Sequence, residues 1–303
     1  MTGPTSNPNT AVPLISVGMP VYNGEDYLAG SLQSVLDQTE GDFELIIADN
    51  ASSDGTEAIC RDFADRDPRI RYVRNASNIG AAGNYNKLLD LARAEFFRWS
   101  NADDLLAPGL HERCLAALRA HPEAVLAYGK TVIIDGDDKK LRDYDDNLAI
   151  DDATPSARFS RYFEQVGLTN AIYGLMRTAA VRRTHVFGDG SLPAADTAFM
   201  AELILHGSFV AVDEPLFYRR MHEAASSHDR GDDSRQTAFW SASQSKFRLP
   251  VIRQHLKYLR RAWRTDADAG EKIRLTGYIL RRLNWHRNEV ASELVGALRR
   301  GSK

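Results

Sequence analysis

The feature that most constrains the fold is the alternation of short β-rich runs with longer amphipathic runs, which begins at Leu14. After the first run, Leu28, Leu32 and Val35 recur at helical spacing, which predicts a helix with one apolar face. This alternation is typical of an α/β protein with a mostly parallel central sheet and helical crossovers. We predict strands at residues 15–19, 43–48, 70–73, 95–99 and 209–218, and a strand with its partner at 124–134.

The remaining segments are predicted from the same patterns. Helices are expected at residues 56–65, 81–94, 108–120 and 196–206. Residues 135–160 are polar and irregular, which predicts a mobile loop. Beyond residue 239 the sequence favours helices throughout, with a break at 265–270.

Open parallel sheets bind ligands beyond the carboxyl ends of their strands, so the turns after the strands carry the functional information. The first turn reads Pro20-Val21-Tyr22-Asn23-Gly24 and lacks the G-x-G-x-x-G pattern of dinucleotide binding. The sequence also contains no G-x-x-x-x-G-K-[ST] phosphate loop. Nicotinamide oxidoreductases and P-loop enzymes are therefore disfavoured.

Acidic and amide side chains follow two of the predicted strands. Asp49 and Asn50 stand at the carboxyl end of the second strand, where they can hydrogen-bond a base edge. Asp103 and Asp104 follow the fourth strand, and adjacent carboxylates are stabilised by a cation such as Mg²⁺ or Mn²⁺ that also holds phosphates. The alternative for Asp104 is that it caps the helix expected near Pro108.

Two further candidates are weak when each is taken alone. Asp196 precedes a predicted helix, where an aspartate is more often an N-cap than a catalytic group. His222 ends the last predicted strand, and a lone histidine is more often a satisfied structural residue than a ligand.

The ordered set of motifs resembles the family 2 glycosyltransferases of GT-A fold over residues 14 to 227. The resemblance rests on Pro20-Val21-Tyr22-Asn23, Asp49 to Thr56, Asn78-Ile79-Gly80 with Asn84 and Asn86, Asp103-Asp104, Asp196, Glu214-Pro215-Leu216 and Arg220-x-His222. It implies a Rossmann-like GT-A fold, a nucleotide-sugar donor and a divalent metal ion, Mn²⁺ or Mg²⁺. Asp103 matches the last aspartate of the family's D-x-D motif and His222 its closing histidine, so both are expected at the metal, and Asp196 matches the catalytic base. The donor is expected to contact Pro20, Tyr22, Asp49, Asn50, Asn78, Gly80, Asn101 and Asp104.

The sequence departs from the family pattern at three of these positions. Asn101 replaces the first aspartate of D-x-D, and Ala195 replaces the acidic residue that often precedes the base. Asn50 replaces an acidic residue placed against uracil, although its amide oxygen can still accept a hydrogen bond from N3–H. Uridine or thymidine nucleotides are favoured, and guanosine stays open.

The expected function is inverting, metal-dependent transfer of a sugar to an acceptor hydroxyl. Three alternatives remain at this stage: a sugar-nucleotide binder without turnover, a nucleotidyltransferase, and a scaffold on a membrane surface. The acceptor is a small molecule, an oligosaccharide or a lipid-linked molecule, and no nucleic-acid partner is expected.

The C-terminal region differs in charge from the rest of the chain. Residues 246–303 contain 15 Lys or Arg and 5 Asp or Glu, although the whole chain has a formal charge of −3. Within the helix expected there, Leu256, Leu259 and Trp263 form an apolar stripe among basic residues. The stripe either docks on the acidic body, which we favour slightly, or lies on an anionic membrane, and the helices could also mediate homo-oligomers.

The expected organisation is a disordered N-terminus at 1–13, a catalytic domain at 14–238 and a basic helical region at 239–303. The two cysteines, Cys60 and Cys114, offer neither a disulfide framework nor zinc-ligand spacing. No secretory signal or long apolar run is present in the sequence. We therefore expect a cytoplasmic protein, either free or peripheral at the inner face of the membrane.

Overall fold

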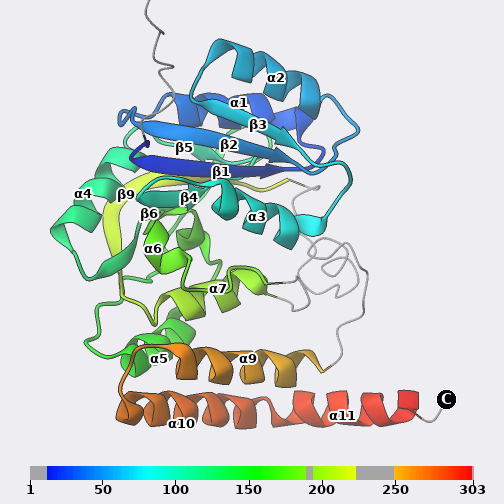
Figure 1. Ribbon diagram of the computed structural model, residues 1–303, viewed down its shortest axis with the longest axis vertical. Coiled ribbons are helices and arrows are strands. Elements are labelled where there is room, and N and C mark those ends of the chain that lie inside the picture. The colour runs from blue at the N-terminus through cyan, green and yellow to red at the C-terminus, as the bar shows by residue number, and fades with distance from the viewer. Residues whose placement is uncertain (1–11, 189–193, 223–248, 302–303) are drawn as a thin grey trace, which may run out of the picture.

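The computed structural model describes residues 12–188, 194–222 and 249–301. Within them, nine strands form one sheet in the order β3-β2-β1-β4-β8-β6-β9-β5, with β7 paired to β6 (Figure 1). The strands are β1 (Ile15–Val21), β2 (Phe43–Asp49), β3 (Ile70–Arg74), β4 (Phe96–Trp99), β5 (Leu105–Leu106), β6 (Ala124–Ile134), β7 (Lys140–Tyr144), β8 (Leu175–Arg177) and β9 (Ser208–Arg220). Because β1–β4, β6 and β9 run in one direction, the predicted mostly parallel sheet is confirmed.

Helices cover both faces of this sheet (Figure 1). They are α1 (Glu25–Leu36), α2 (Thr56–Arg66), α3 (Gly80–Leu91), α4 (Leu110–Ala120), α5 (Pro155–Gln165), the 3₁₀ helix η2 (Asn170–Tyr173), α6 (Thr178–Val181), α7 (Ala195–Leu203), α9 (Pro250–Arg264), α10 (Ala269–Trp285) and α11 (Arg287–Gly301). Leu45 and Ile47 of β2 belong to the cluster that contains α1, α2 and α4. Ile46 and Ala48 belong to the cluster that contains α3, α5, α7, α9 and α10. Alternate residues of one strand thus feed two cores, which explains why the buried strands read as continuous apolar runs.

Close packing fixes α3 against the centre of the sheet. A Cβ added at Gly18 of β1 would lie 2.9 Å from Leu88 Cβ of α3. Only a glycine therefore permits this approach without a shift of the helix. The contact fixes the carboxyl half of α3, whose amino end follows the turn after β3 at the carboxyl edge of the sheet.

Two predicted segments differ from the structure. Residues 135–160 contain β7 and the start of α5 rather than a continuous loop, and residues 124–134 form one unbroken strand, β6. The edge strand β7 is almost entirely exposed, so it has no apolar alternation that would reveal it. The sequence does contain a local signal for the start of α5, which is Thr154 followed by Pro155. In the structure Thr154 caps the helix by accepting a hydrogen bond from Ala157 N, and Pro155 occupies the first turn.

The C-terminal helices pack beneath the sheet domain, with α9 next to α7 and α10 next to α5 and α9 (Figure 1). The predicted break is confirmed: α9 ends at Arg264, and Asp268 caps α10 by accepting from Glu271 N at 2.9 Å. Part of the docking prediction is wrong. The face of α9 that packs on the body carries His255, Tyr258, Arg261 and Ala262, whereas Leu256 and Trp263 of the predicted stripe are 57% and 56% exposed.

The predicted disordered N-terminus lies almost wholly outside the described residues, as does the predicted boundary between 238 and 239. That domain division therefore stays a prediction. No helix in the described part of the chain is long and apolar enough to cross a membrane.

Candidate active site

Three chain segments meet at the carboxyl edge of the sheet. The chain leaves β1 toward β2 and β3 on one side and later returns to β4 on the other, which creates a topological switch point beside β1. Asn23 N donates to Ser52 Oγ and Ser53 N donates to Asn23 Oδ1, both at 2.9 Å, so the first two turns are joined. Next to this junction Pro20 is half-buried and Tyr22 is 52% exposed, which leaves the tyrosine ring available to a ligand.

Asp49 lies at the end of β2 with its side chain fully buried. Its Oδ2 accepts from Tyr72 Oη at 2.7 Å and from Arg74 Nη1 at 2.6 Å, and its Oδ1 accepts from Ser52 N at 2.8 Å. Burial alone would raise the pKa of this carboxyl, but the hydrogen bonds from Ser52, Tyr72 and Arg74 together hold the pKa below its usual value. Asp49 is thus a fixed anion that holds the end of β3 and the second turn together.

Asn50 belongs to a network of amides. Its Oδ1 accepts from Ile79 N at 2.9 Å and from Asn75 Nδ2 at 3.0 Å, and its Nδ2 donates to Asn78 Oδ1 at 2.8 Å. Asn78 Oδ1 also accepts from Gly80 N at 2.8 Å, and Gly80 adopts a φ of 77°, a region that favours glycine. The structure therefore brings together Asn50, Asn78 and Gly80, three of the residues that the resemblance assigns to the donor.

The network extends to three residues that the sequence analysis did not single out as donor contacts. Asn75 Nδ2 also donates to Asn84 Oδ1 at 3.0 Å, and Lys87 Nζ donates to Asn75 Oδ1 at 2.6 Å. The signal that could have found them is the concentration of asparagines between residues 75 and 86. A lysine amine reaching this edge adds positive charge beside the turn of Asn78.

Asp103 is the accessible acid at the end of β4. Its side chain is 34% exposed, and its Oδ2 lies 3.1 Å from His222 Nε2, whose side chain is 15% exposed. Arg220 Nε donates to Asp103 O at 2.8 Å, and the Arg220 guanidinium lies 4.5 Å from the centre of the Tyr27 ring. The ring of Tyr27 also lies 4.8 Å from that of His222. Tyr27 was missed because nothing in an amphipathic helix marks one aromatic residue as a support for a site.

Asp104 has a different environment from its neighbour. It is buried, its Oδ1 accepts from Arg220 N at 2.9 Å, and its Oδ2 accepts from Asn101 Nδ2 at 2.8 Å. Asn101 Oδ1 in turn accepts from Tyr85 Oη at 2.9 Å. Burial, and then the charge of Asp103, raise the pKa of Asp104 to about 7. The proposed capping role is wrong, because α4 begins after Gly109, and Asp104 instead ties the end of β4 to β9.

The donor set formed by Asp103 and His222 fits a divalent cation. A carboxylate and an imidazole lie side by side, and Mg²⁺ or Mn²⁺ is commonly held by few protein ligands together with substrate phosphates. In the part of the chain that the structure describes, no group of three or more His, Cys, Asp or Glu side chains is arranged to hold a metal. A cation here would therefore take its remaining ligands from phosphate or water.

Asp196 stands in the first turn of α7, apart from these two clusters. Its Oδ1 accepts from Thr197 N at 2.7 Å, and Tyr162 Oη donates to Thr197 O at 3.2 Å. Ala194 rather than Asp196 occupies the N-cap, so the capping alternative is wrong. Among the described residues, Asp196 makes no hydrogen bond or ion pair with either cluster.

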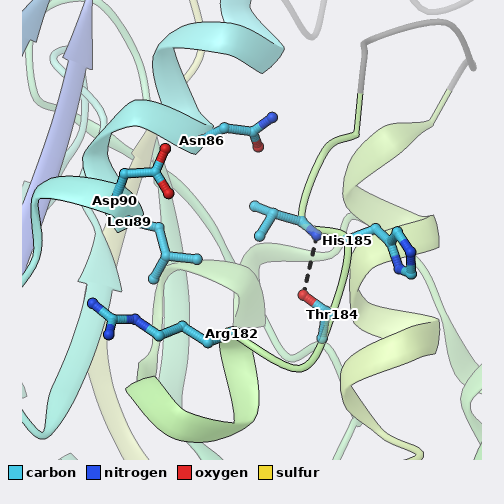
Figure 2. A pocket seen from close by; sticks show the side chains of 7 residues that line it. Asn86, Leu89, Asp90, Arg182, Thr184 and His185 are labelled. Atoms are coloured by element: carbon cyan, nitrogen blue, oxygen red, sulfur yellow. Dashed lines mark hydrogen bonds between the residues drawn. The ribbon is translucent and has the colours of Figure 1, made fainter. Parts of the chain in front are cut away.

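A pocket of about 580 Å³ opens between α3 and the segment that follows α6 (Figure 2). It is lined by Asn86, Leu89, Asp90, Arg182, Thr184, His185 and Val186. Asn86 Nδ2 donates to Gly188 O at 2.8 Å, which fastens this segment to α3. None of the site residues predicted from the sequence lines this pocket.

The wall of this pocket is connected to the C-terminal helices through a buried glutamate. Glu202 of α7 is 4% exposed, and its Oε2 lies 3.1 Å from Arg261 Nε of α9. The same carboxylate accepts from His185 N at 2.9 Å, and Arg261 Nη1 donates to Ala198 O of α7 at 3.3 Å. The helix that carries Asp196 is thus fixed from one side by α9.

We expect Arg261→Met to lower the free energy of unfolding by about 3 kcal/mol, because removing one partner leaves a buried charge on Glu202. The matched control is Arg260→Met, since Arg260 is exposed on the same helix, and its effect should stay within about 0.5 kcal/mol. Urea unfolding followed by circular dichroism measures both variants. Equal effects in the two variants would show that the Glu202–Arg261 pair does not stabilise this junction.

A family model described as Glycosyl transferase family 2 matches residues 16–189, more than half of the chain. An uncharacterized glycosyltransferase of Methanocaldococcus jannaschii is 31% identical over 134 residues, which cover 44% of this chain and 46% of that protein. The chain spans less than half the length of the curated relatives that it matches.

Two solved structures resemble the whole arrangement. S. aureus TarS 1–349, in complex with UDP, has a TM-score of 0.63 at 16% identity and covers 89% of this chain and 71% of its own. Mannosyltransferase PcManGT from Pyrobaculum calidifontis, in complex with GDP-Man and Mn²⁺, has a TM-score of 0.58 at 18% identity and covers 95% of this chain and 76% of its own. At such low identities the similarity establishes the fold alone. It confirms the predicted GT-A type of α/β fold with a helical C-terminal region.

Proposed function

The chain belongs to glycosyl transferase family 2, and on this basis we propose that it moves a sugar from a nucleoside-diphosphate sugar to an acceptor hydroxyl with inversion. The observation that carries the proposal is that two polar clusters lie at the carboxyl edge of the sheet beyond β2 and β4, the strands on either side of β1. One cluster contains Asp49, Asn50, Asn78 and Gly80, and the other contains Asn101, Asp103, Asp104 and His222. Such a place in an open α/β sheet suits a nucleotide on one side and its diphosphate on the other.

The proposed donor carries uridine or thymidine. Tyr22 is exposed beside the Asn50 network and can cover a base or ribose with its ring. Asn50 Oδ1 already accepts two hydrogen bonds, so base contacts through Asn50 would use its remaining amide hydrogen or a rearranged turn. UDP in the TarS complex supports a uridine donor, whereas GDP-Man in the PcManGT complex keeps guanosine as the alternative.

Asp103 and His222 are the proposed holders of the metal ion. When bound there, Mn²⁺ or Mg²⁺ supplies positive charge that offsets the charge developing on the leaving diphosphate. Mn²⁺ in the PcManGT complex supports this assignment. The Arg220 side chain holds the loop of Asp103 in place by donating to the Asp103 backbone carbonyl. Tyr27 packs against both Arg220 and His222.

Asp196 is the proposed general base. The acceptor oxygen attacks the anomeric carbon from the face opposite the diphosphate and forms a new bond, while the bond to the diphosphate oxygen breaks and that oxygen keeps the electron pair. The hydroxyl proton passes to the Asp196 carboxylate. Because Thr197 N donates only to Oδ1, Oδ2 is the oxygen suited to receive this proton.

Thermal unfolding with nucleotides tests donor binding directly. UDP with Mn²⁺ should raise the melting temperature, and a chelator should remove most of this increase, because a ligand stabilises the state that binds it. GDP and CDP with Mn²⁺ serve as the base-selectivity comparison. Absence of stabilisation by every nucleotide, with and without metal, would contradict the proposed donor site.

Turnover is tested separately by incubating the chain with a panel of nucleotide sugars and measuring the released nucleotide. Release that depends on both metal and an added acceptor supports transfer. Binding without any release would favour the alternative of a sugar-nucleotide binder, and release of pyrophosphate from a nucleoside triphosphate and a sugar phosphate would favour a nucleotidyltransferase.

A further inference from the structure

The exposed apolar side chains of this protein are concentrated on the C-terminal helices. Of the eleven large apolar residues that are exposed in the described part of the chain, seven lie on α9, α10 and α11. The helices α9 and α10 run side by side along one edge of the molecule, and α11 continues the line of α10 (Figure 1). A concentration of exposed apolar side chains on one surface usually marks a site of interaction with another protein or a membrane.

Four of these side chains form one patch. On α9, Leu256 and Trp263 are seven residues apart and therefore share a helix face, and on α10 Ile273 and Leu280 have the same spacing. Trp263 Nε1 donates to Thr276 Oγ1 at 3.0 Å, and Thr276 lies between Ile273 and Leu280 on the α10 surface. The two pairs thus lie next to each other as the α9–α10 patch, with exposures from 50% to 64%.

Two basic residues, Arg260 and Lys272, lie beside the α9–α10 patch in a region of positive net charge. Residues 250–301 contain twelve Lys or Arg and five Asp or Glu. Arg260 lies between Leu256 and Trp263 on the same face of α9, and Lys272 precedes Thr276 by one turn of α10. Each of the five acidic residues has a partner within the chain. Glu271 is buried, Asp268 caps α10, and the other three contact groups of the chain: Asp266 pairs with Arg183, Glu289 with His286, and Glu293 accepts from Val251 N.

We propose that the α9–α10 patch binds the surface of an anionic phospholipid bilayer. A tryptophan with aliphatic neighbours and basic side chains around them is the composition that inserts at the boundary between headgroups and acyl chains. The positive charge complements anionic headgroups, whereas a two-fold contact between copies would bring the basic patch of one copy against the basic patch of the other. The proposal is independent of the proposed donor chemistry, and its test contains no sugar nucleotide.

The test is co-sedimentation of the full chain with vesicles of phosphatidylcholine, with or without phosphatidylglycerol. Binding is expected only with phosphatidylglycerol, and it should weaken as the salt concentration rises and the Debye length falls from about 10 Å at 0.1 M to about 3 Å at 1 M. Trp263→Ser with Leu280→Ser should lower the partition coefficient at least about tenfold. Arg260→Gln with Lys272→Gln should lower it by about 25-fold, because each basic side chain near the surface contributes about fivefold.

Leu141→Ser is the matched control, since Leu141 is 57% exposed on β7, outside the patch. This variant should bind vesicles like the wild type, and all variants should keep the wild-type melting temperature within a few degrees. The proposal is overturned if the full chain ignores anionic vesicles at low salt, or if the Trp263/Leu280 variant binds them unchanged. Gel filtration completes the test: a dimer that the same variant dissociates, in a chain that ignores vesicles, would assign the patch to a second copy.

Discussion

Replacing Asp103 by alanine is expected to abolish the Mn²⁺-dependent part of donor-nucleotide binding. The Asp103 side chain is one-third exposed, and the only partner of its carboxylate among the described residues is His222. Its loss therefore removes the proposed metal ligand without opening the core. The melting temperature of the free protein should therefore change little. Titration calorimetry with UDP, in the presence of Mn²⁺ or of a chelator, measures the effect.

Asp62→Ala provides the matched control for Asp103→Ala. Asp62 is an exposed carboxylate on α2 that pairs with Arg66, so its removal changes the net charge equally but touches neither cluster. This variant should bind the nucleotide as the wild type does. If Asp103→Ala retains the full Mn²⁺-dependent affinity, Asp103 is not a metal ligand, and the assignment of the second cluster to the diphosphate is wrong.

Replacing Asp196 by asparagine should lower the turnover number by roughly 10²- to 10⁴-fold, the usual contribution of a general base. The amide oxygen can still accept from Thr197 N, so α7 should keep its first turn and the fold its stability. Donor binding should be unchanged, because Asp196 contacts neither of the two clusters through a described hydrogen bond. Initial rates of nucleotide release at saturating donor, together with the donor dissociation constant, separate these effects.

Asp90→Asn is the control for the chemical change itself. Asp90 is an exposed carboxylate on α3 that lines the pocket of Figure 2 and belongs to neither cluster. Its turnover should stay within a few-fold of wild type. A similarly small effect in Asp196→Asn would mean that Asp196 only stabilises the first turn of its helix.

The agreement between sequence and structure is best where many residues carry the same signal. The strands β1 and β2 are buried on both faces, which agrees with the mostly apolar runs that predicted them. The edge strand β7 and the short strands β5 and β8 were missed, because two to five residues with exposed or mixed side chains give no periodicity.

The location of the candidate site also followed from the sequence. Side chains at the carboxyl ends of neighbouring parallel strands must lie at one edge of the sheet, whatever their rotamers. The structure places Asp49 with Asn50, and Asp103 with Asp104, beyond the ends of β2 and β4 at that edge. The partners of these side chains were not predictable, because most of them are distant in the chain. Tyr72 and Arg74 reach Asp49 from β3, and Arg220 reaches Asp104 from β9.

The sequence by itself determined the alternation of the longer buried strands with helices, the edge of the sheet where the polar turns gather, and the basic character of the C-terminal helices. These follow from local periodicity and from the chain direction, which neighbouring residues are enough to specify. Only the tertiary structure decided which of the two adjacent acids is accessible. Arg220 N donates to the buried carboxylate of Asp104, whereas the carboxylate of Asp103 lies at the surface beside His222. The tertiary structure also decided which face of α9 is buried. Glu202 accepts Arg261 inside the protein, and this pairing turns Leu256 and Trp263 outward against the expectation from their apolarity. A side chain's surroundings depend on groups far away in the sequence, and the free energy of satisfying a buried charge can outweigh that of burying one more apolar side chain.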